Sequence, residues 1–226
     1  MRGNKPALMQ IFSTGTLPLY YCHSLTVSLD IARVLYKTGI RAIEYTNRGS
    51  AALENFTEMR KVLALELPSL HLGIGTVKSK EEAEAYVAAG ADFIVSPIVN
   101  PAVAEVAKGA GLPWIAGCMT PTEIYQAQQL GAAVIKLFPA NILKPEFLRS
   151  ILTLFIGVKF IPTGGVEIDE KNIRDWFQSG VVAVGMGSKL ISEEVMIHGK
   201  YDLLEDRTLQ VLSIIQKVKK ELNPTT

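Results

Sequence analysis

The chain has 226 residues, of which 48% are hydrophobic and 20% are charged, and its formal net charge is +1 at pH 7. Acidic and basic residues are interspersed, which argues against a surface built to bind nucleic acid or an anionic membrane. The two cysteines, Cys22 and Cys118, lack C-x-x-C spacing, which disfavours a disulfide framework and a thiolate metal site.

Residues 1–15 lack a long apolar segment followed by a small-residue cleavage site, so we expect no signal peptide. No apolar run reaches the roughly 18 residues that a membrane-spanning helix needs. The sequence therefore predicts a cytoplasmic protein.

Short apolar runs alternate with amphipathic stretches along the chain. After a short capping helix before residue 15, strands are expected at 17–22, 42–46, 71–77, 92–99, 113–119, 133–139, 158–165 and 183–188. Helical patterns lie between them, for example at 79–90 and 120–131. Several end in glycines suited to the left-handed position after a helix, at Gly39, Gly90, Gly131 and Gly180. Residues 192–204 are predicted to be the longest irregular stretch, before a last helix at 209–222.

The spacing of the strands predicts the fold. Strand starts recur about every 20–28 residues, the length of one βα unit, which indicates a parallel sheet. Eight such units predict an α/β fold, a (β/α)8 TIM barrel with a short N-terminal capping helix, occupying residues 1–226 as a single domain. An open doubly wound sheet is the alternative. Such a sheet usually has a glycine-rich fingerprint after its first strand, and YYCHSLT is not one.

One charged residue, Lys136, lies inside an apolar run of the predicted sixth strand. Strand alternation puts Lys136 and Phe138 on one face of that strand, and Glu44 and Thr46 on one face of the second strand. Even-numbered strands contribute to the same interior layers of a barrel. We therefore expect Lys136 and Glu44 to face each other at the C-terminal mouth, where such barrels place their active sites.

A lysine in this position has a chemical use. Removal from water disfavours the charged form of a lysine, and the neutral amine can attack a carbonyl carbon to form a Schiff base. Glu44 is then the candidate for proton transfer beside Lys136. The alternative interpretation is a buried ion pair that only holds the barrel together.

Glycine-rich turns follow the last two predicted strands, PTGG at 162–165 and GMGS at 185–188. Barrel enzymes commonly hold phosphate after strands 7 and 8, on backbone N–H groups and helix N-termini. Glycine lets the backbone approach phosphate oxygens closely, and Thr163 and Ser188 add hydroxyl donors. Turns that only connect elements are the alternative, but two on neighbouring strands favour phosphate binding.

Three further residues are expected at the same rim: Thr76 in GIGTV, Arg48 after the second strand and Pro97 at the end of the fourth. Taken alone, Thr76 fits a contact to a carboxylate or hydroxyl, and an ordinary strand threonine nearly as well. Arg48 fits a solvated loop arginine better than a carboxylate clamp. Pro97 fits a loop start equally well. The three histidines lack the spacing of metal ligands, so we expect no metal site.

Together these motifs resemble the 2-keto-3-deoxy-6-phosphogluconate (KDPG) and 4-hydroxy-2-oxoglutarate (KHG) aldolase family, which are class I lysine aldolases. The resemblance covers roughly residues 15–220. The matching blocks are IEYTNR (43–48), GIGTV (73–77), IVSP (94–97), GCMTPTE (117–123), IKLFPA (135–140), PTGGV (162–166) and VGMGS (184–188). Their joint order makes the resemblance specific.

The resemblance implies roles for individual residues. It implies that Lys136 forms the Schiff base, that Glu44 handles protons, and that Arg48 and Thr76 hold the keto-acid carboxylate. It also implies that the pyruvate pocket is lined by Pro97 and Phe138 and that phosphate is held by Thr163, Gly164, Gly165, Gly187 and Ser188. Family members form trimers and need no metal, which implies a homotrimer without a cofactor, acting on a small keto-sugar-acid substrate.

The sequence departs from the family pattern at three places. Many members have a basic residue near the end of the first strand, where this chain has Tyr20, Tyr21 and His23. Ile74 replaces the usual alanine of G-A-G-T-V and is expected to add volume near the site, and SPIV replaces the more usual S-P-G/H-L. We expect these changes to lie around the aldehyde half of the substrate.

The implied reaction is cleavage of KDPG to pyruvate and glyceraldehyde 3-phosphate, with KHG, cleaved to pyruvate and glyoxylate, as a second substrate. A 2-keto-3-deoxy-6-phosphogalactonate aldolase and a non-catalytic phosphosugar-binding barrel remain alternatives. A third alternative is another phosphate-binding barrel, such as a sugar-phosphate epimerase or a thiamine-phosphate-forming enzyme. It remains because fold analogy alone does not determine the reaction.

Overall fold

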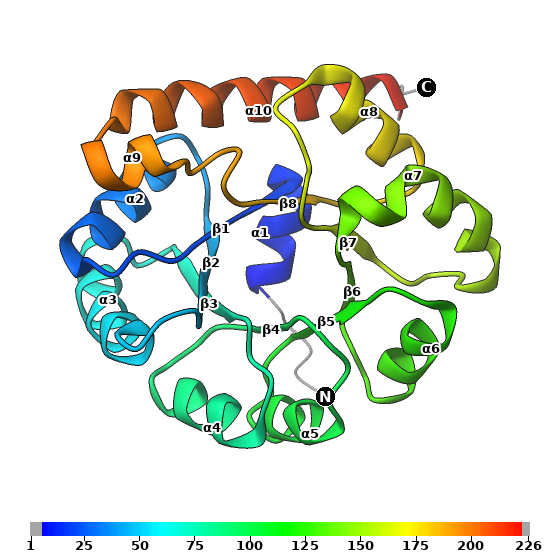
Figure 1. Cartoon of the computed structure of the whole chain (residues 1–226), viewed down its shortest axis with the longest axis horizontal. Coiled ribbons are helices and arrows are strands. Elements are labelled where there is room, and N and C mark those ends of the chain that lie inside the picture. Colours follow the sequence, from blue (N-terminus) through cyan, green and yellow to red (C-terminus); the bar gives the residue numbers. More distant parts are fainter. Residues whose placement is uncertain (1–5, 223–226) are drawn as a thin grey trace.

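The computed structural model describes residues 6–222. Its strands form one parallel sheet in the order β7-β6-β5-β4-β3-β2-β1-β8. Figure 1 shows the strands as a ring, with the N-terminal helix in the middle of the view and the other helices outside the ring. The strands are β1 (Thr16–Tyr20), β2 (Ala42–Thr46), β3 (His71–Gly75), β4 (Ile94–Ser96), β5 (Trp114–Cys118), β6 (Val134–Leu137), β7 (Phe160–Pro162) and β8 (Val184–Met186).

The sheet closes on itself. β1 pairs in parallel with β2 on one side and with β8 on the other. Between β7 and β8 there is an isolated bridge from Thr163 to Gly185, and the N–H of Val182 donates to the carbonyl of Phe160 at 3.0 Å. The predicted (β/α)8 barrel is therefore confirmed, and the open doubly wound sheet is excluded.

The helices follow the strands around the barrel. They are α1 (Pro6–Thr14), α2 (Leu25–Lys37), α3 (Ala52–Glu66), α4 (Lys80–Ala88), α5 (Pro101–Gly109), α6 (Pro121–Gln129), α7 (Ala140–Ile151), the 3-10 turn η1 (Leu152–Leu154), α8 (Glu170–Gln178), α9 (Glu193–His198) and α10 (Tyr201–Leu222). None of the helices within residues 6–222 is both long enough and apolar enough to cross a membrane.

Local sequence signals fix where the helices begin and end. Ser79 and Thr120 each form a capping box with the glutamate three residues later, which satisfies N–H groups at the starts of α4 and α6. The predicted glycine stops are also present. Gly39, Gly90, Gly131 and Gly180 all have positive φ, between 84° and 103°, directly after a helix cap.

Helix α1 closes the end of the barrel where the strands begin. Ala7, Leu8 and Ile11 are buried in a cluster with inward-facing residues from six of the strands and from the residues just before β4 and β8. Those residues are Leu17, Ala42, Phe93, Val95, Ile115, Val134 and Ile161, with Ala183 just before β8. The capping helix expected before residue 15 is thus confirmed. Because this end is filled by apolar side chains, a substrate can enter only from the opposite end.

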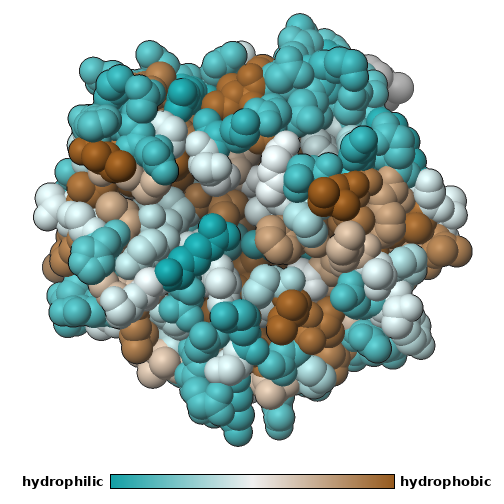
Figure 2. Space-filling model, in the orientation of Figure 1, coloured by the Kyte–Doolittle hydropathy of each residue, from teal (hydrophilic) through white to brown (hydrophobic). Residues whose placement is uncertain are grey.

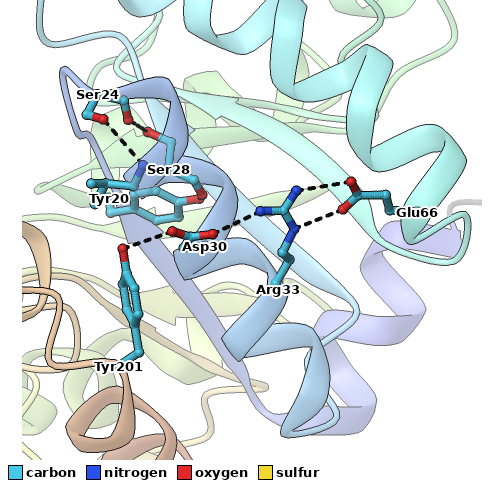
Figure 3. Close-up of polar contacts among 8 residues, drawn as sticks. Tyr20, Ser24, Ser28, Asp30, Arg33, Glu66 and Tyr201 are labelled. Carbon is cyan, nitrogen blue, oxygen red and sulfur yellow. Dashed lines mark hydrogen bonds and ion pairs between the residues drawn. The ribbon is translucent and has the colours of Figure 1, made fainter.

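The outer face of the barrel packs against the surrounding helices, and polar contacts link these helices to one another. Tyr201 at the start of α10 donates to Asp30 of α2 at 3.2 Å, and Asp30 accepts from Arg33 at 2.9 Å. Arg33 in turn reaches both carboxylate oxygens of Glu66 on α3, at 2.9 and 3.0 Å (Figure 3). The carboxylates and Arg33 are partly exposed, so these contacts stabilise the fold modestly.

The prediction for residues 192–204 was wrong. Most of this segment is helical, because α9 covers Glu193–His198 and α10 begins at Tyr201, earlier than the predicted start at residue 209. Gly199 separates the two helices with φ 62°, in the left-handed conformation that glycine adopts readily. A six-residue helix is too short to show a helical period in the sequence.

Candidate active site

The charged pair predicted inside the barrel lies at its open end. Lys136 on β6 and Glu44 on β2 approach each other, with 3.5 Å between Nζ and Oε1. Lys136 is 5% exposed and Glu44 is 1% exposed. Ile135 and Leu137, which alternate with Lys136, pack on the outer side among the helices. An amine and a carboxylate thus lie together in a mostly apolar interior. Their electrostatic interaction with each other is stronger there than it would be in water.

Two glycines lie at the level of this pair, on the strands beside β2 and β6. A Cβ added at Gly75 of β3 would lie 1.9 Å from Oε1 of Glu44. A Cβ added at Gly117 of β5, which pairs with Lys136, would lie 2.4 Å from the backbone carbonyl of Pro97. Both strands therefore require glycine for packing at this level. Our sequence analysis did not single out either residue, although glycine inside a strand often marks such a close approach.

Phe138 lies between the lysine and the first glycine-rich turn. The centre of its ring is 5.6 Å from Nζ of Lys136. A Cβ added at Gly164 would lie 3.5 Å from the same ring. Pro97 directly follows β4 and is partly buried beside Gly117. The predicted pocket residues Pro97 and Phe138 are thus both placed around the mouth of the barrel.

Arg48 and Thr76 follow the neighbouring strands β2 and β3. The loops that carry them are joined, because the N–H of Asn47 donates to the carbonyl of Gly75 at 2.8 Å. Thr76 has φ 64°, a left-handed conformation that is uncommon for a residue with a branched side chain. Such strain is concentrated at functional sites. The Arg48 side chain is exposed at this rim, so it is accessible to a ligand in solution.

The two glycine-rich turns lie next to each other, because Thr163 is bridged to Gly185. A Cβ at Gly185 would lie 2.2 Å from Oγ1 of Thr163, which is itself buried. Gly164 and Gly165 have φ of 92° and 87°, so the first turn requires a conformation that other residues rarely adopt.

The carbonyls of the first turn are already occupied. Ala140 N–H donates to the Thr163 carbonyl at 2.9 Å, and Asn141 N–H donates to the Gly164 carbonyl at 2.8 Å. The first turn is therefore held against the start of α7.

The second turn is held by hydrogen bonds to the residues that follow it. The Gly187 carbonyl accepts from the N–H groups of Leu190 and Ile191, both at 2.9 Å, and the Ser188 side chain is exposed. Lys189, the next residue, pairs with Glu167 beyond the first turn at 3.0 Å. The turns after β7 and β8 are thus also linked by charge. In the orientation of Figure 1, the space-filling surface is hollowed near the centre of the ring of strands (Figure 2).

The unusual residues at the end of β1 are placed differently from our expectation. Tyr20 points away from the barrel interior, and its hydroxyl donates to the carbonyl of Ser28 in α2 at 2.7 Å (Figure 3). Burial raises the pKa of Tyr20 well above its ordinary value. Tyr21 packs on the ring of Tyr45 with 5.8 Å between centroids, and His23 is exposed. Tyr20 therefore stabilises the β1–α2 packing and does not line the mouth.

Two apolar residues of the strands that flank β2, Ile74 and Leu19, lie on opposite faces of the sheet near Glu44. Ile74 was expected to add volume near the site, but it lies in the outer core cluster among the helices, between the inward-facing Gly73 and Gly75. That expectation was wrong. The β1 residue paired with Glu44 is Leu19, which also lies beside Gly187. An apolar side chain therefore occupies the position between the glutamate and the second turn.

Metal binding has no obvious donor set here. Within residues 6–222, no group of three or more His, Cys, Asp or Glu side chains is arranged to hold a metal ion. What the site offers is a buried amine, a carboxylate within reach of it and two adjoining turns rich in glycine. These are the parts needed for covalent chemistry on the carbonyl of an anionic substrate.

The sequence matches the KDPG and KHG aldolase family over residues 14–206. The chain belongs to this family. It is 32% identical over 203 residues to the 2-dehydro-3-deoxy-phosphogluconate aldolase of Treponema pallidum, which covers 88% of this chain and 94% of the relative. It is 29% identical over 205 residues to the KHG/KDPG aldolase of Escherichia coli, covering 89% and 93% of the two chains.

Solved structures agree with this assignment. The KDPG aldolase of Legionella pneumophila, with pyruvate captured as a covalent carbinolamine intermediate, superposes with a TM-score of 0.81 at 27% identity, over 93% of this chain and 98% of the other. As a member of this family, the chain is a class I aldolase and thus a carbon–carbon lyase. The epimerase, thiamine-phosphate and non-catalytic alternatives are therefore set aside.

Proposed function

We propose that this aldolase cleaves KDPG to pyruvate and glyceraldehyde 3-phosphate, with Lys136 as the Schiff-base lysine and Glu44 as the proton-transfer group. The observation that carries the proposal is the buried pair itself. Nζ and Oε1 are 3.5 Å apart, at the open end of a barrel that belongs to the KDPG and KHG aldolase family. A structural ion pair needs no access to ligand, whereas this one lies at the end of the barrel that α1 leaves open.

The first half of the reaction builds the covalent intermediate. The neutral amine of Lys136 attacks the C2 ketone and forms a carbinolamine. Glu44 donates a proton, through a water molecule, to the departing hydroxyl, and an iminium forms with release of water. The iminium is an electron sink for the bond that breaks next. The aromatic face of Phe138, 5.6 Å from Nζ, stabilises positive charge at this nitrogen.

The second half breaks the carbon–carbon bond. Glu44, now a carboxylate, removes the proton of the C4 hydroxyl, the C3–C4 bond breaks, and its electrons pass to the iminium to give an enamine. The aldehyde product leaves. Glu44 then passes its proton to C3 of the enamine, and water hydrolyses the resulting iminium to release pyruvate and free Lys136.

Binding of the two ends of the substrate uses the remaining rim residues. Arg48 and Thr76 hold the carboxylate, and their joined loops favour a common ligand. The phosphate is held by Thr163, Gly164, Gly165, Gly187 and Ser188. The bridge between Thr163 and Gly185 supports this part of the proposal, because it brings the two turns together.

Trapping with borohydride tests the role of Lys136. Pyruvate and borohydride should add a reduced adduct to a single peptide that contains Lys136. Lys136→Met should abolish both trapping and cleavage, whereas the control Lys108→Met, an exposed lysine of α5, should leave both unchanged. Capture of pyruvate on another lysine would refute the assignment.

Proton exchange tests the role of Glu44. Glu44→Gln should lower kcat by about 10²–10⁴, the usual range for a general acid–base group. It should also slow exchange of the pyruvate methyl protons with solvent deuterium, followed by NMR. A normal exchange rate in this variant would show that another group transfers the proton.

The preferred substrate is settled by direct comparison. We expect KDPG to be cleaved with a higher kcat/KM than KHG, because the paired turns add phosphate contacts. Preference for 2-keto-3-deoxy-6-phosphogalactonate would change the assigned configuration at C4 but not the lysine chemistry. A homotrimer in the cytoplasm is also part of the proposal, supported by the family resemblance, and light scattering of the purified protein measures the oligomeric state.

A further inference from the structure

Thr46, the last residue of β2, has a hydroxyl with no hydrogen-bond partner. Among residues 6–222, its Oγ1 is the buried side-chain polar atom that remains unpaired, and the residue is 1% exposed. Buried hydroxyls are nearly always hydrogen-bonded, because an unpaired one has lost its hydrogen bonds to water without forming any in the protein. The protein keeps this hydroxyl unsatisfied at the mouth of the barrel.

The position of Thr46 links it to the carboxylate of Glu44. Alternation along β2 puts both side chains on the inner face, while Ile43 and Tyr45 belong to the outer core. Thr46 pairs across the sheet with Gly75. Oε1 of Glu44 lies 1.9 Å from where a Cβ of Gly75 would be. The carboxylate therefore extends along the barrel to the level of the Thr46–Gly75 pair.

The other neighbours of Glu44 cannot hold its carboxylate. Its partners across the sheet are Leu19 on β1 and Gly73 on β3, which have no polar side chain. The charged group that faces it is Lys136 from β6, at 3.5 Å. Arg48, two residues beyond Thr46, is exposed at the rim. Once Lys136 is bonded to substrate and its nitrogen is part of a neutral enamine, the ammonium that faced Glu44 no longer exists.

We propose that Thr46 is a positioning residue for Glu44, and that its hydroxyl donates a hydrogen bond to the carboxyl group of Glu44 during the enamine stage of the reaction, when Glu44 holds the proton that passes to C3. This inference rests on the proposed function, since it assigns Glu44 to proton transfer at C3. The hydroxyl reaches the carboxylate by rotation about the Cα–Cβ bond of Thr46. It keeps this carboxyl group directed at the substrate carbon when Lys136 can no longer do so.

The test compares two substitutions at Thr46. Thr46→Val removes the hydroxyl and keeps the shape, whereas Thr46→Ser keeps the hydroxyl. Thr46→Val should slow deuterium exchange into pyruvate by about ten- to a hundredfold, the effect of losing a hydrogen bond to a group that becomes charged as its proton passes to C3. Borohydride trapping and the KM for pyruvate should not change, because Schiff-base formation keeps Lys136 and the carboxylate site intact. Thr46→Ser should restore most of the exchange rate.

A second threonine provides the matched control. Thr208 in α10 is fully buried, and its hydroxyl donates to the carbonyl of Leu204 at 2.7 Å. Thr208→Val should lower the melting temperature and leave exchange unchanged. Thr46→Val should not lower the melting temperature, because it removes a hydroxyl that has no partner in the free protein.

Two results would overturn the proposal directly. They are normal exchange in Thr46→Val, and exchange in Thr46→Ser as slow as in Thr46→Val, which would point to packing by the methyl group. Failure of the wild-type protein to be trapped by pyruvate and borohydride is a different result. It would overturn the Schiff-base chemistry, and this role of Thr46 with it.

Discussion

Substitution of Gly75 by alanine tests whether the position of the Glu44 carboxylate matters. The added methyl would lie 1.9 Å from Oε1, 2.6 Å from Cδ and 2.7 Å from Cγ of Glu44. To reach an ordinary non-bonded separation, the end of the side chain must retreat by about 1 Å or more. Gly75 does not have a positive φ, so the alanine introduces no backbone strain of its own.

The expected effect follows from this displacement. Misplacement of a reacting group by about 1 Å can cost on the order of a hundredfold in rate, so we expect Gly75→Ala to lower kcat by about that factor. The cost in stability should be about 1–3 kcal/mol, the usual penalty for overpacking a filled interior. Cleavage of KDPG, coupled to reduction of the released pyruvate by lactate dehydrogenase, measures kcat, and urea unfolding measures stability.

Gly109→Ala is the control, because a Cβ at Gly109 has no atom within 4 Å. It should leave kcat unchanged and should not destabilise the protein, since alanine is the better helix former. A Gly75→Ala variant with the kcat of the wild type would refute the reasoning. It would mean that Glu44 works equally well from a displaced position, or that it does not take part in the rate-limiting step.

Three more predictions concern the phosphate, the first strand and the buried thiol. Ser188→Ala should lower kcat/KM for KDPG by about ten- to a hundredfold, because a charge-assisted hydrogen bond to the phosphate is lost. Cleavage of KHG should be unchanged. Equal losses for both substrates would show that Ser188 does not bind phosphate. Tyr20→Phe should lower the free energy of unfolding in urea by about 1–3 kcal/mol, since the Ser28 carbonyl loses its donor, with kcat unaffected; a loss of activity instead would place Tyr20 in the site. Burial raises the pKa of the Cys118 thiol to about 12, so the thiol stays protonated as the pH rises well beyond neutrality. Iodoacetamide at about pH 8 should therefore label Cys118 only after unfolding, as read by peptide mass spectrometry, and rapid labelling of the native protein would contradict its burial.

The sequence was sufficient to predict the barrel and the meeting of Lys136 with Glu44. Both follow from rules that act over a few residues: alternation along a strand, glycine after a helix and the regular βα repeat. Given the barrel, the even-numbered strands β2 and β6 must contribute to common interior layers. The glycine-rich turns were found in the same way, because their place after the last two strands depends on chain order alone.

The sequence was not sufficient where register or the exact end of a strand decides the outcome. Tyr20 is the last residue of β1, and its side chain points outward. The sequence predicted that this strand continues to residue 22 and did not determine which face of the strand carries Tyr20. The closeness of Gly75 to Glu44, and the pairing of Gly75 with Thr46, depend on how β2 and β3 are aligned. That alignment is set by packing across the sheet, so it cannot be read from the sequence of either strand alone.

The pairing of β1 with β8 has a consequence for how the chain is made. Thr16 pairs with Val184, and its hydroxyl donates to the Val184 carbonyl at 3.2 Å, so these two neighbours are 168 positions apart in the chain. During synthesis on the ribosome, β1 emerges long before β8, its partner in the sheet, has been made. Until then the free edge of β1 can pair with other strands, which is a route to aggregation. Folding to the closed ring must therefore wait for synthesis of nearly the whole chain, and such distant contacts form slowly.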